Sequence, residues 1–249
     1  MELIPTLGVA ELMQAKRILA VQPHYDDNDI AVGGTLHTLA NTGAEIIYLT
    51  VTDDRTGIIN TDWGIAEADR RLQEDQLKAG LSIGIRKQIR LGFPDAGSYD
   101  YFSLRKMIIQ NILVTKPDFI FCVDPWSPYE AHTDHILTGK ATAEAAILYS
   151  LPKILLAENA DLGDYQLQGV VFYNTAYPNL VFDITEAMQS KQDALRAYRA
   201  QFNQQDLEDL VIKTTYLSTY TARQQVFKFG EALKIIEPWM LHGVPLTKQ

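Results

Sequence analysis

The sequence predicts an α/β fold with a Rossmann-like, mostly parallel, doubly wound sheet and a C-terminal α/β elaboration. In the first half of the chain, short β-branched runs alternate with longer helical patterns. Alternating units of this size indicate parallel strands joined by right-handed crossovers. The composition agrees, because 249 residues with 47% hydrophobic and 21% charged residues are ordinary for a globular chain.

The regular pattern begins with the apolar run RILAVQ, which predicts a strand over residues 17–22 and is followed by a helical pattern over 32–42. The β-branched run EIIYLTVT predicts the next strand, and the turn-rich loop DDRTGIINTDWG separates it from a charged amphipathic helix. The same alternation continues to about residue 150. Strands are expected at 17–22, 45–52, 87–93 and 118–124, and helices at 32–42, 65–81, 103–115 and from the loop after 124 to about 150.

The pattern is less regular in the rest of the chain. KILLA (153–157), GVVFYN and LVFDI indicate further strands, whereas 185–200 and 227–236 indicate helices. No linker rich in Gly, Ser or Pro interrupts the sequence. We therefore expect one domain over 1–249, with a Rossmann-like half to about 157 and a C-terminal elaboration over about 158–249.

The charge balance argues against a nucleic-acid partner, because the net charge of −9 offers no basic face to displace counterions. A small-molecule substrate fits better. The single cysteine, Cys122, lies in an apolar run and predicts no disulfide or cysteine metal cluster. No segment reaches about 18 uninterrupted apolar residues, so we expect no membrane span and a cytoplasmic protein.

A crowded acidic loop follows the first expected strand. The six residues from His24 to Asp29 hold one imidazole and three carboxylates, at the carboxyl end of a parallel strand where α/β sheets bind ligands. A cation would relieve the repulsion among the carboxylates. The mixture of His and Asp favours zinc, or another divalent transition metal, over magnesium. The alternative is a solvated turn that caps the following helix.

A second loop offers the remaining ligands. His132 and His135 follow another expected strand, and in a sheet ordered 3-2-1-4-5 the first and fourth strands are neighbours. The two loops would then converge on one crevice and supply the three protein ligands usual for catalytic zinc.

The sequence resembles the PIG-L/LmbE-like zinc de-N-acetylases. PHYDDNDIAVGGTL is similar to the PHPDD-x-E-x-G-x-GGTL signature of that family, and AHTDH is similar to its A-HPDH signature. Further similar stretches are RRLQEDQLKAGLSIG, RLGFPDAG, VFDIT, KQDALRAYRAQF and FGEALKII. The resemblance spans nearly the whole chain in order. It implies a hydrolase that removes an N-acetyl group from an amino sugar or its conjugate and releases acetate and a free amine.

The resemblance also implies roles for individual residues. It makes His24, Asp27 and His135 the zinc ligands and Asp26 the general base. His132 would stabilise the oxyanion or protonate the leaving amine, with Asp134 orienting its imidazole. Arg71 and Asp95 would bind the sugar. From the residues alone, Arg71 is as well explained by a surface ion pair on its helix, and Asp95 by an ordinary turn.

The sequence departs from the family pattern at three positions near the site. Tyr25 and Thr133 stand where the signatures have Pro, so both loops lose a fixed backbone torsion, and Asp29 stands where the family usually has Glu. None of these changes removes a ligand. Alternative functions are a catalytically silent sugar-binding module and a metal-dependent hydrolase of another bond. A homo-oligomer would be in keeping with the resemblance, and His242 is read as a surface residue.

Overall fold

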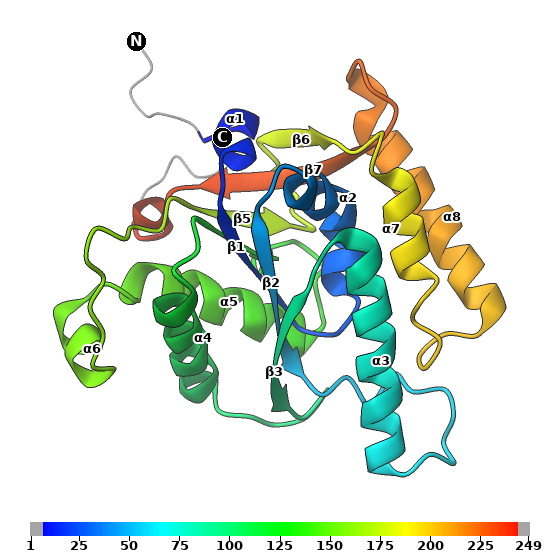
Figure 1. The fold of residues 1–249 in the computed structure, drawn as a ribbon, viewed down its shortest axis with the longest axis horizontal. Helices are drawn as coiled ribbons and strands as arrows, with labels where there is room; N and C mark the ends of the chain where they lie inside the picture. Colours follow the sequence, from blue (N-terminus) through cyan, green and yellow to red (C-terminus); the bar gives the residue numbers. More distant parts are fainter. Residues whose placement is uncertain (1–6, 244–249) are drawn as a thin grey trace.

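The fold is built on a seven-stranded sheet of order β3-β2-β1-β4-β5-β7-β6 (Figure 1). It is seen in a computed structural model that describes residues 7–243. The first five strands in this order, from β3 across to β5, are parallel to one another. β7 is antiparallel to both of its neighbours, β5 and β6. The mostly parallel, doubly wound sheet predicted from the sequence is therefore confirmed. The strands are β1 Arg17–Gln22, β2 Glu45–Thr52, β3 Lys87–Phe93, β4 Phe119–Val123, β5 Gly169–Tyr173, β6 Leu180–Asp183 and β7 Gly230–Ile236.

Helices cover both faces of the sheet (Figure 1). Helices α2, α3 and α7 contact one another on one face, and α4 and α5 pack together on the other. The helices are α1 Val9–Met13, α2 Asp27–Asn41, α3 Ile65–Ile83, α4 Tyr101–Thr115, α5 Thr133–Leu148, α6 Pro152–Ala157, α7 Met188–Leu195 and α8 Gln204–Thr221, with 3₁₀ turns η1 Ala222–Gln224 and η2 Pro238–Leu241. No helix in this described part of the chain is long and apolar enough to cross a membrane.

The central strands are apolar on both sides because each side faces a helix layer. In β1, Ile18 and Ala20 belong to the core beneath α2 and α3, whereas Leu19 and Val21 belong to the core beneath α4 and α5. Such strands read as continuous hydrophobic runs rather than as alternating ones. This is why β1, β2 and β4 could be located from the sequence as apolar runs.

Residues 153–157, which were expected to form a strand, form helix α6 instead. Pro152 occupies the first turn of the helix, where its missing N–H is not needed, and α6 has no buried residue. A short apolar run is ambiguous between strand and helix when only its periodicity is considered. The place beside β4 in the sheet is taken by β5.

The helix expected at 227–236 is also wrong, because residues 230–236 form strand β7. The stretch GEALKII contains good helix formers, but it lies between β5 and β6 and pairs with both. Tertiary pairing overrides local propensity here. The helix expected at 185–200 is present as the shorter α7, and α8 was not anticipated at all.

Helix α2 begins at Asp27, earlier than the expected residue 32, and has a kink at Val32. The predicted helix corresponds to the part after the kink. The Glu231 carboxylate of β7 accepts hydrogen bonds from the backbone N–H groups of Gly34 (3.0 Å) and Thr35 (2.8 Å) just after the kink. An anion is favourable at such free N–H groups. The C-terminal part of the chain thus supports the helix that follows the acidic loop.

Candidate metal centre

Two loops meet at the carboxyl end of the sheet. Residues 23–26 follow β1, residues 124–132 follow β4, and the two strands are adjacent and parallel. Helix α5 passes close to the end of β4 at Gly139, which has no side chain. A Cβ atom at Gly139 would lie 2.5 Å from the carbonyl oxygen of Val123. The convergence expected from the strand order is therefore present in the structure.

His24, Asp27 and His135 form one of two groups in the described chain that could hold a metal ion. Asp27 Oδ2 lies 3.2 Å from His24 Nδ1, and Asp27 Oδ1 lies 3.3 Å from His135 Nε2. One ligand atom from each of the three residues lies within 4.8 Å of the others. These are the three residues that the resemblance implied as zinc ligands.

The remaining ring nitrogen of each histidine faces a carboxylate. His24 Nε2 lies 3.2 Å from Asp95 Oδ1 and 3.6 Å from Asp134 Oδ2. His135 Nδ1 lies 3.0 Å from Glu130 Oε2. Histidines that bind a metal through one nitrogen commonly donate the other N–H to a carboxylate, which fixes the tautomer. The donor set and its surroundings therefore fit a transition metal.

The electrostatics of the cluster favour a positive charge at its centre. Burial opposes ionisation of His24, but hydrogen bonds to Asp27 and Asp95 raise its pKa to about 11. Burial likewise opposes ionisation of Asp27, yet hydrogen bonds from His135 and His24 hold the pKa of this carboxyl well below its usual range. A metal cation would satisfy the same preference.

Asp26 lies directly before the Asp27 ligand and is buried. Burial and the negative charge of Asp27 raise the pKa of Asp26 to about 7. A carboxyl group with a pKa near neutrality is suited to take up and release protons at physiological pH.

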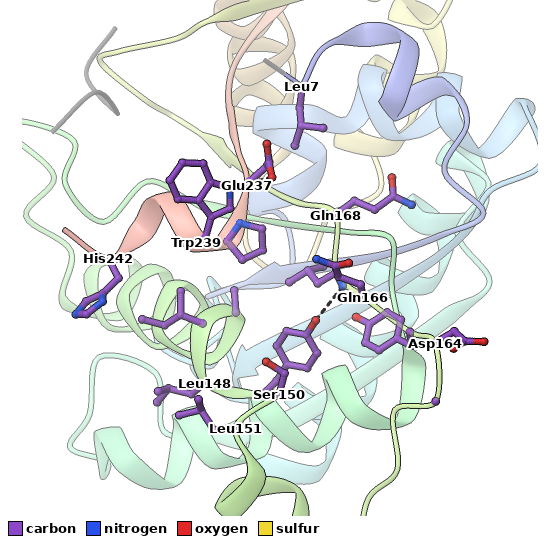
Figure 2. A pocket seen from close by; sticks show the side chains of 17 residues that line it. Leu7, Leu148, Ser150, Leu151, Asp164, Gln166, Gln168, Glu237, Trp239 and His242 are labelled. Atoms are coloured by element: carbon purple, nitrogen blue, oxygen red, sulfur yellow. Dashed lines mark hydrogen bonds between the residues drawn. The ribbon is translucent and has the colours of Figure 1, made fainter. Parts of the chain in front are cut away.

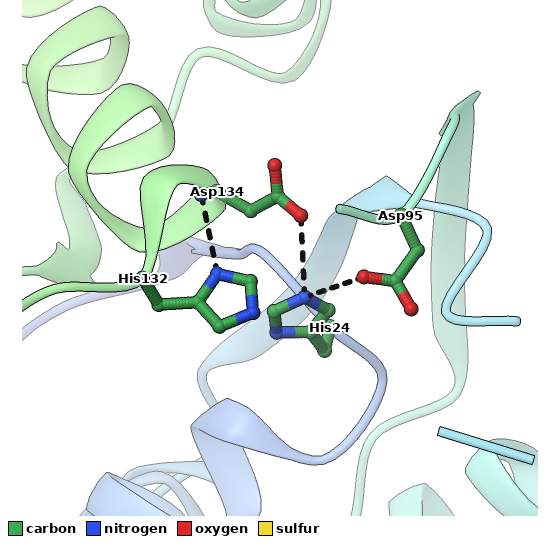
Figure 3. A group of neighbouring side chains, drawn as sticks. All are labelled: His24, Asp95, His132 and Asp134. Atoms are coloured by element: carbon green, nitrogen blue, oxygen red, sulfur yellow. Dashed lines mark hydrogen bonds and ion pairs between the residues drawn. The ribbon is translucent and has the colours of Figure 1, made fainter. Parts of the chain in front are cut away.

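His132 and Asp134 lie at the start of α5, beside His24 (Figure 3). The backbone N–H of Asp134 donates to His132 Nδ1 at 3.2 Å, so His132 caps the helix. The Asp134 carboxylate is held instead by the Ala96 N–H (2.8 Å) and the Tyr99 hydroxyl (2.9 Å). The resemblance implied that Asp134 orients the His132 imidazole, and in this structure the contact between them is made by the backbone amide of Asp134.

The two expected sugar-binding residues differ in their placement. Asp95 lies within the cluster, where its second carboxylate oxygen accepts the Thr56 N–H at 2.8 Å. Arg71 is exposed on α3, where it donates to Glu67 at 2.8 Å and places its guanidinium 5.6 Å from the centre of the Trp63 ring. Arg71 thus makes the surface ion pair that the sequence left open, and its contact with a sugar stays a prediction.

Several polar residues around the cluster were not found from the sequence. Glu130 contacts His135, and Tyr99 donates to Asp134. Of these two residues, only Glu130 could have been found from the sequence, because it lies next to the AHTDH motif. Asp29, predicted only as a departure from Glu, is fully buried between the hydroxyl groups of Tyr48 and Tyr198. These contacts join distant segments, so no local pattern announces them.

A separate hollow of about 1210 Å³ lies at the other end of α5 (Figure 2). Residues 146–151, 163–168 and the segment around Trp239 line it, and Tyr149 accepts a hydrogen bond from the Leu167 N–H at 2.9 Å. A helix rises about 1.5 Å per residue, so this hollow is well separated from His135 at the helix start. His242 lines this hollow, whereas none of the expected catalytic, metal or sugar-binding residues does.

The mostly parallel α/β sheet thus carries, at the carboxyl ends of two neighbouring strands, a His/Asp group that could hold a metal ion, at the edge where such sheets bind ligands. The chain belongs to the PIG-L (GlcNAc-PI de-N-acetylase) family, whose model matches residues 19–146, just over half of the chain. The family resemblance predicted from the sequence is confirmed. Members similar to this chain are deacetylases, that is, amidohydrolases.

Three relatives illustrate the similarity. The diacetylchitobiose deacetylase of Thermococcus kodakarensis is 31% identical, and the match covers 93% of this chain and 87% of the relative. A probable N-acetyl-α-D-glucosaminyl L-malate deacetylase of Bacillus anthracis is 27% identical over 75% and 82% of the two chains. The structure of N,N'-diacetylchitobiose deacetylase from Pyrococcus horikoshii, complexed with an inhibitor, superimposes with a TM-score of 0.88 at 28% identity, covering 96% and 90% of the two chains.

Proposed function

We propose that this chain is a zinc-dependent deacetylase that hydrolyses the N-acetyl group of an amino sugar, with short N-acetylglucosamine saccharides as its substrate class. The observation that carries the proposal is the convergence of His24, Asp27 and His135, each histidine backed by a carboxylate. The diacetylchitobiose deacetylases among the relatives support the choice of substrate class.

His24, Asp27 and His135 would hold the metal, and their two imidazoles with one carboxylate favour zinc over magnesium. A zinc ion at this position supplies Lewis acidity, which lowers the pKa of water and polarises a carbonyl oxygen. The carboxylates behind the two imidazoles keep each ring in the tautomer that leaves a lone pair for the metal.

Asp26 is the proposed general base. Its carboxylate takes one proton from the attacking water while the oxygen of that water bonds to the acetamide carbon. The C–N bond then breaks, the amine nitrogen gains a proton, and acetate and a free amine leave. The raised pKa of Asp26 suits a group that accepts the proton and later releases it.

His132 is the proposed donor on the other side of the acetamide. Because its Nδ1 accepts the Asp134 N–H, a neutral imidazole carries its proton on Nε2. That N–H can donate to the carbonyl oxygen as negative charge develops there, or to the leaving nitrogen. Asp134, through its backbone amide, fixes which nitrogen is available.

Asp95 and Arg71 are the proposed contacts to the sugar. Asp95 lies beside His24 and offers an acceptor for a hydroxyl, and the Arg71 guanidinium beside Trp63 offers donors next to an aromatic face. Sugar rings pack well against such faces, so Arg71 on α3 and Trp63 in the loop before α3 fit a saccharide ring.

The test is metal analysis of the purified protein, combined with acetate release from a panel that includes diacetylchitobiose. We expect about one zinc per chain and acetate from at least one saccharide, with both lost in His135→Ala and kept in His37→Ala on helix α2. Zinc without acetate release from any saccharide would contradict the proposal and favour a sugar-binding module or a hydrolase of another bond. Absence of zinc would contradict the metal assignment itself.

A further inference from the structure

The peptide unit at Tyr25 joins a metal ligand to the base, since His24 precedes it and Asp26 follows it. The similar family signature has Pro here, a residue with a fixed φ and no N–H. Tyr25 has neither the fixed torsion nor the missing donor. The position of the His24 and Asp26 side chains therefore depends on what this chain supplies in place of proline.

Asp54, from the loop after β2, accepts the N–H of Tyr25. The distance from the Tyr25 nitrogen to Asp54 Oδ2 is 2.9 Å, and the side chain of Gln201 donates to Asp54 Oδ1, also at 2.9 Å. Asp54 is only 2% exposed. Its carboxylate is therefore held from two sides with one oxygen directed at the Tyr25 amide.

The opposite side of the same residue is fixed as well. The carbonyl oxygen of Tyr25 accepts from the Tyr198 hydroxyl at 2.9 Å and from Gln22 Nε2 at 3.2 Å. Its ring is buried, with the Arg90 guanidinium 5.4 Å from the ring centre. Of the backbone contacts of Tyr25, the one made by its N–H is the one that a proline at this position could not make.

The arrangement at Asp54 is unfavourable in two respects. Its φ is +56°, in the left-handed region that glycine adopts more readily than aspartate. Its carboxylate is also buried close enough to Asp26 and Asp27 to repel them. Residues held in such a state persist where the surrounding contacts determine them, and such residues are concentrated at functional sites.

We infer that Asp54 is a positioning residue, whose carboxylate holds the Tyr25 amide and thereby fixes the His24 ligand and the Asp26 base in place of the missing proline torsion. The inference rests on the proposed function for its effect on catalysis. Its effect on metal binding does not depend on the substrate. Asp54 itself contacts neither the ligand side chains nor the sugar in this assignment.

The test places Asp54→Ala in three backgrounds: the wild type, Tyr25→Ala and Tyr25→Pro. Tyr25→Ala removes the ring but keeps the N–H, whereas Tyr25→Pro removes both and restores a fixed φ. Zinc affinity is measured by competition with a chelator, and kcat and KM by acetate release. Melting temperatures of the zinc-free proteins report any effect on the fold.

In the wild type and in Tyr25→Ala, Asp54→Ala should weaken zinc affinity and lower kcat by about 10-fold each, the size typical of residues that support ligands. KM should change by no more than about twofold. In Tyr25→Pro the same substitution should change zinc affinity and kcat by less than about twofold, because no N–H remains to be held. An equal loss in all three backgrounds would show a role in the fold alone and overturn the inference.

Asp54→Asn provides the conservative variant. Asparagine keeps an acceptor oxygen for the Tyr25 N–H, and Gln201 Oε1, buried and without a hydrogen-bond partner among the described residues, can accept from the new amide after a flip. We expect zinc affinity and kcat near wild type. If the wild type binds zinc but releases no acetate, the proposed function fails while the zinc-affinity cycle still decides the role of Asp54. A wild type without zinc would overturn both.

Discussion

At the scale of single residues, the proposed metal-binding group is organised around Asp27. Its two carboxylate oxygens face different histidines. The backbone N–H of His24, three residues earlier, also donates to Asp27 Oδ2 at 2.8 Å. This hydrogen bond within one turn fixes the Asp27 carboxylate relative to the loop. The proposed general base, Asp26, and the proposed ligand, Asp27, are thus adjacent residues with different surroundings and different pKa values.

Substitution of Asp26 by Asn should separate catalysis from metal binding. The amide cannot accept a proton from water, so kcat should fall by about 10² to 10⁴-fold, the usual contribution of a general base. Zinc content should stay at the wild-type level because Asp26 is not a proposed ligand. Asp164→Asn, on the distant hollow, serves as the control. A loss of zinc together with activity would make Asp26 a ligand rather than a base.

The pH dependence of kcat/KM should report the same residue. Burial and the Asp27 charge raise the pKa of Asp26 to about 7, and a nearby cation would lower it from that value. Since the ionised form is the active base, kcat/KM should rise with pH through a pKa below about 7. The rising limb should be absent from the residual activity of Asp26→Asn, which a pH titration of both proteins would reveal.

At the scale of elements, the site depends on how closely α5 approaches β4. The helix carries both histidines of the second motif, and Gly139, one turn after His135, is where its backbone passes the end of the strand. The same helix end is tied to the loop before α4 through Asp134, Ala96 and Tyr99. Small displacements of α5 would move His132 and His135 together.

Gly139→Ala should therefore weaken zinc binding without touching a ligand. The added Cβ would lie 2.5 Å from a backbone oxygen and 2.9 Å from Pro125, so the helix must shift. Overpacking of this kind costs about 1–3 kcal/mol of stability. Gly64→Ala, where a Cβ meets nothing within 4 Å, is the matched control. Melting temperature and zinc affinity should both fall in Gly139→Ala alone, and equal values in the two variants would contradict this account.

Strands and helices were predictable where the spacing of apolar residues in the sequence matches the burial of those residues in the fold. β1, β2 and β4 are buried in a parallel sheet with helices on both sides, and their apolar runs follow directly from that environment. Residues 153–157 were assigned wrongly because a short apolar run is ambiguous between strand and helix, and residues 230–236 because their helix propensity was overridden. In β7, the pairing with β5 and β6 decides the structure, and neither partner is near in sequence.

At the scale of the whole molecule, a buried ion pair connects the C-terminal part to the site. Lys191 of α7 and Glu231 of β7 lie 2.6 Å apart, with side chains 2% and 3% exposed. Glu231 also accepts the hydroxyl of Thr35 at 2.6 Å, beside the kink of α2. The helix that begins at Asp27 is thus supported by residues about 200 positions later.

Glu231→Gln should be strongly destabilising, since it leaves the Lys191 ammonium buried without its counter-charge. Removal of one partner of a buried ion pair typically costs about 3–5 kcal/mol. Asp193→Asn, which removes one partner of the more exposed contact with Arg196, should cost less than about 1 kcal/mol. Urea unfolding of the two variants would compare these costs. Similar midpoints would show that the Lys191–Glu231 pair contributes little.

Removal of the proposed zinc should lower the stability of the whole chain, because the ion would bind the folded site and not the separated loops. At a free zinc concentration 100 times the Kd, zinc binding adds about 2.7 kcal/mol to the free energy of unfolding. For a chain of this size, that corresponds to a shift in Tm of about 5–10 °C. Thermal scans with zinc and with a chelator should show this shift in the wild type and not in His135→Gln. A shift of equal size in both would place zinc elsewhere.

The sequence by itself determined the parallel sheet and the two loops that meet at its end, because buried strands and their order leave a clear pattern in the chain. The position of the two motifs directly after strands indicated a metal site, and the family resemblance implied His24, Asp27 and His135 as its ligands. Only the tertiary structure decided which groups hold those ligands. Glu130 contacts His135 directly, whereas Asp54 and Glu231 accept backbone N–H groups near the acidic loop. Asp54 and Glu231 come from segments remote in sequence from the groups they bind. Such bonds depend on the relative position of packed elements, which periodicity and composition do not encode.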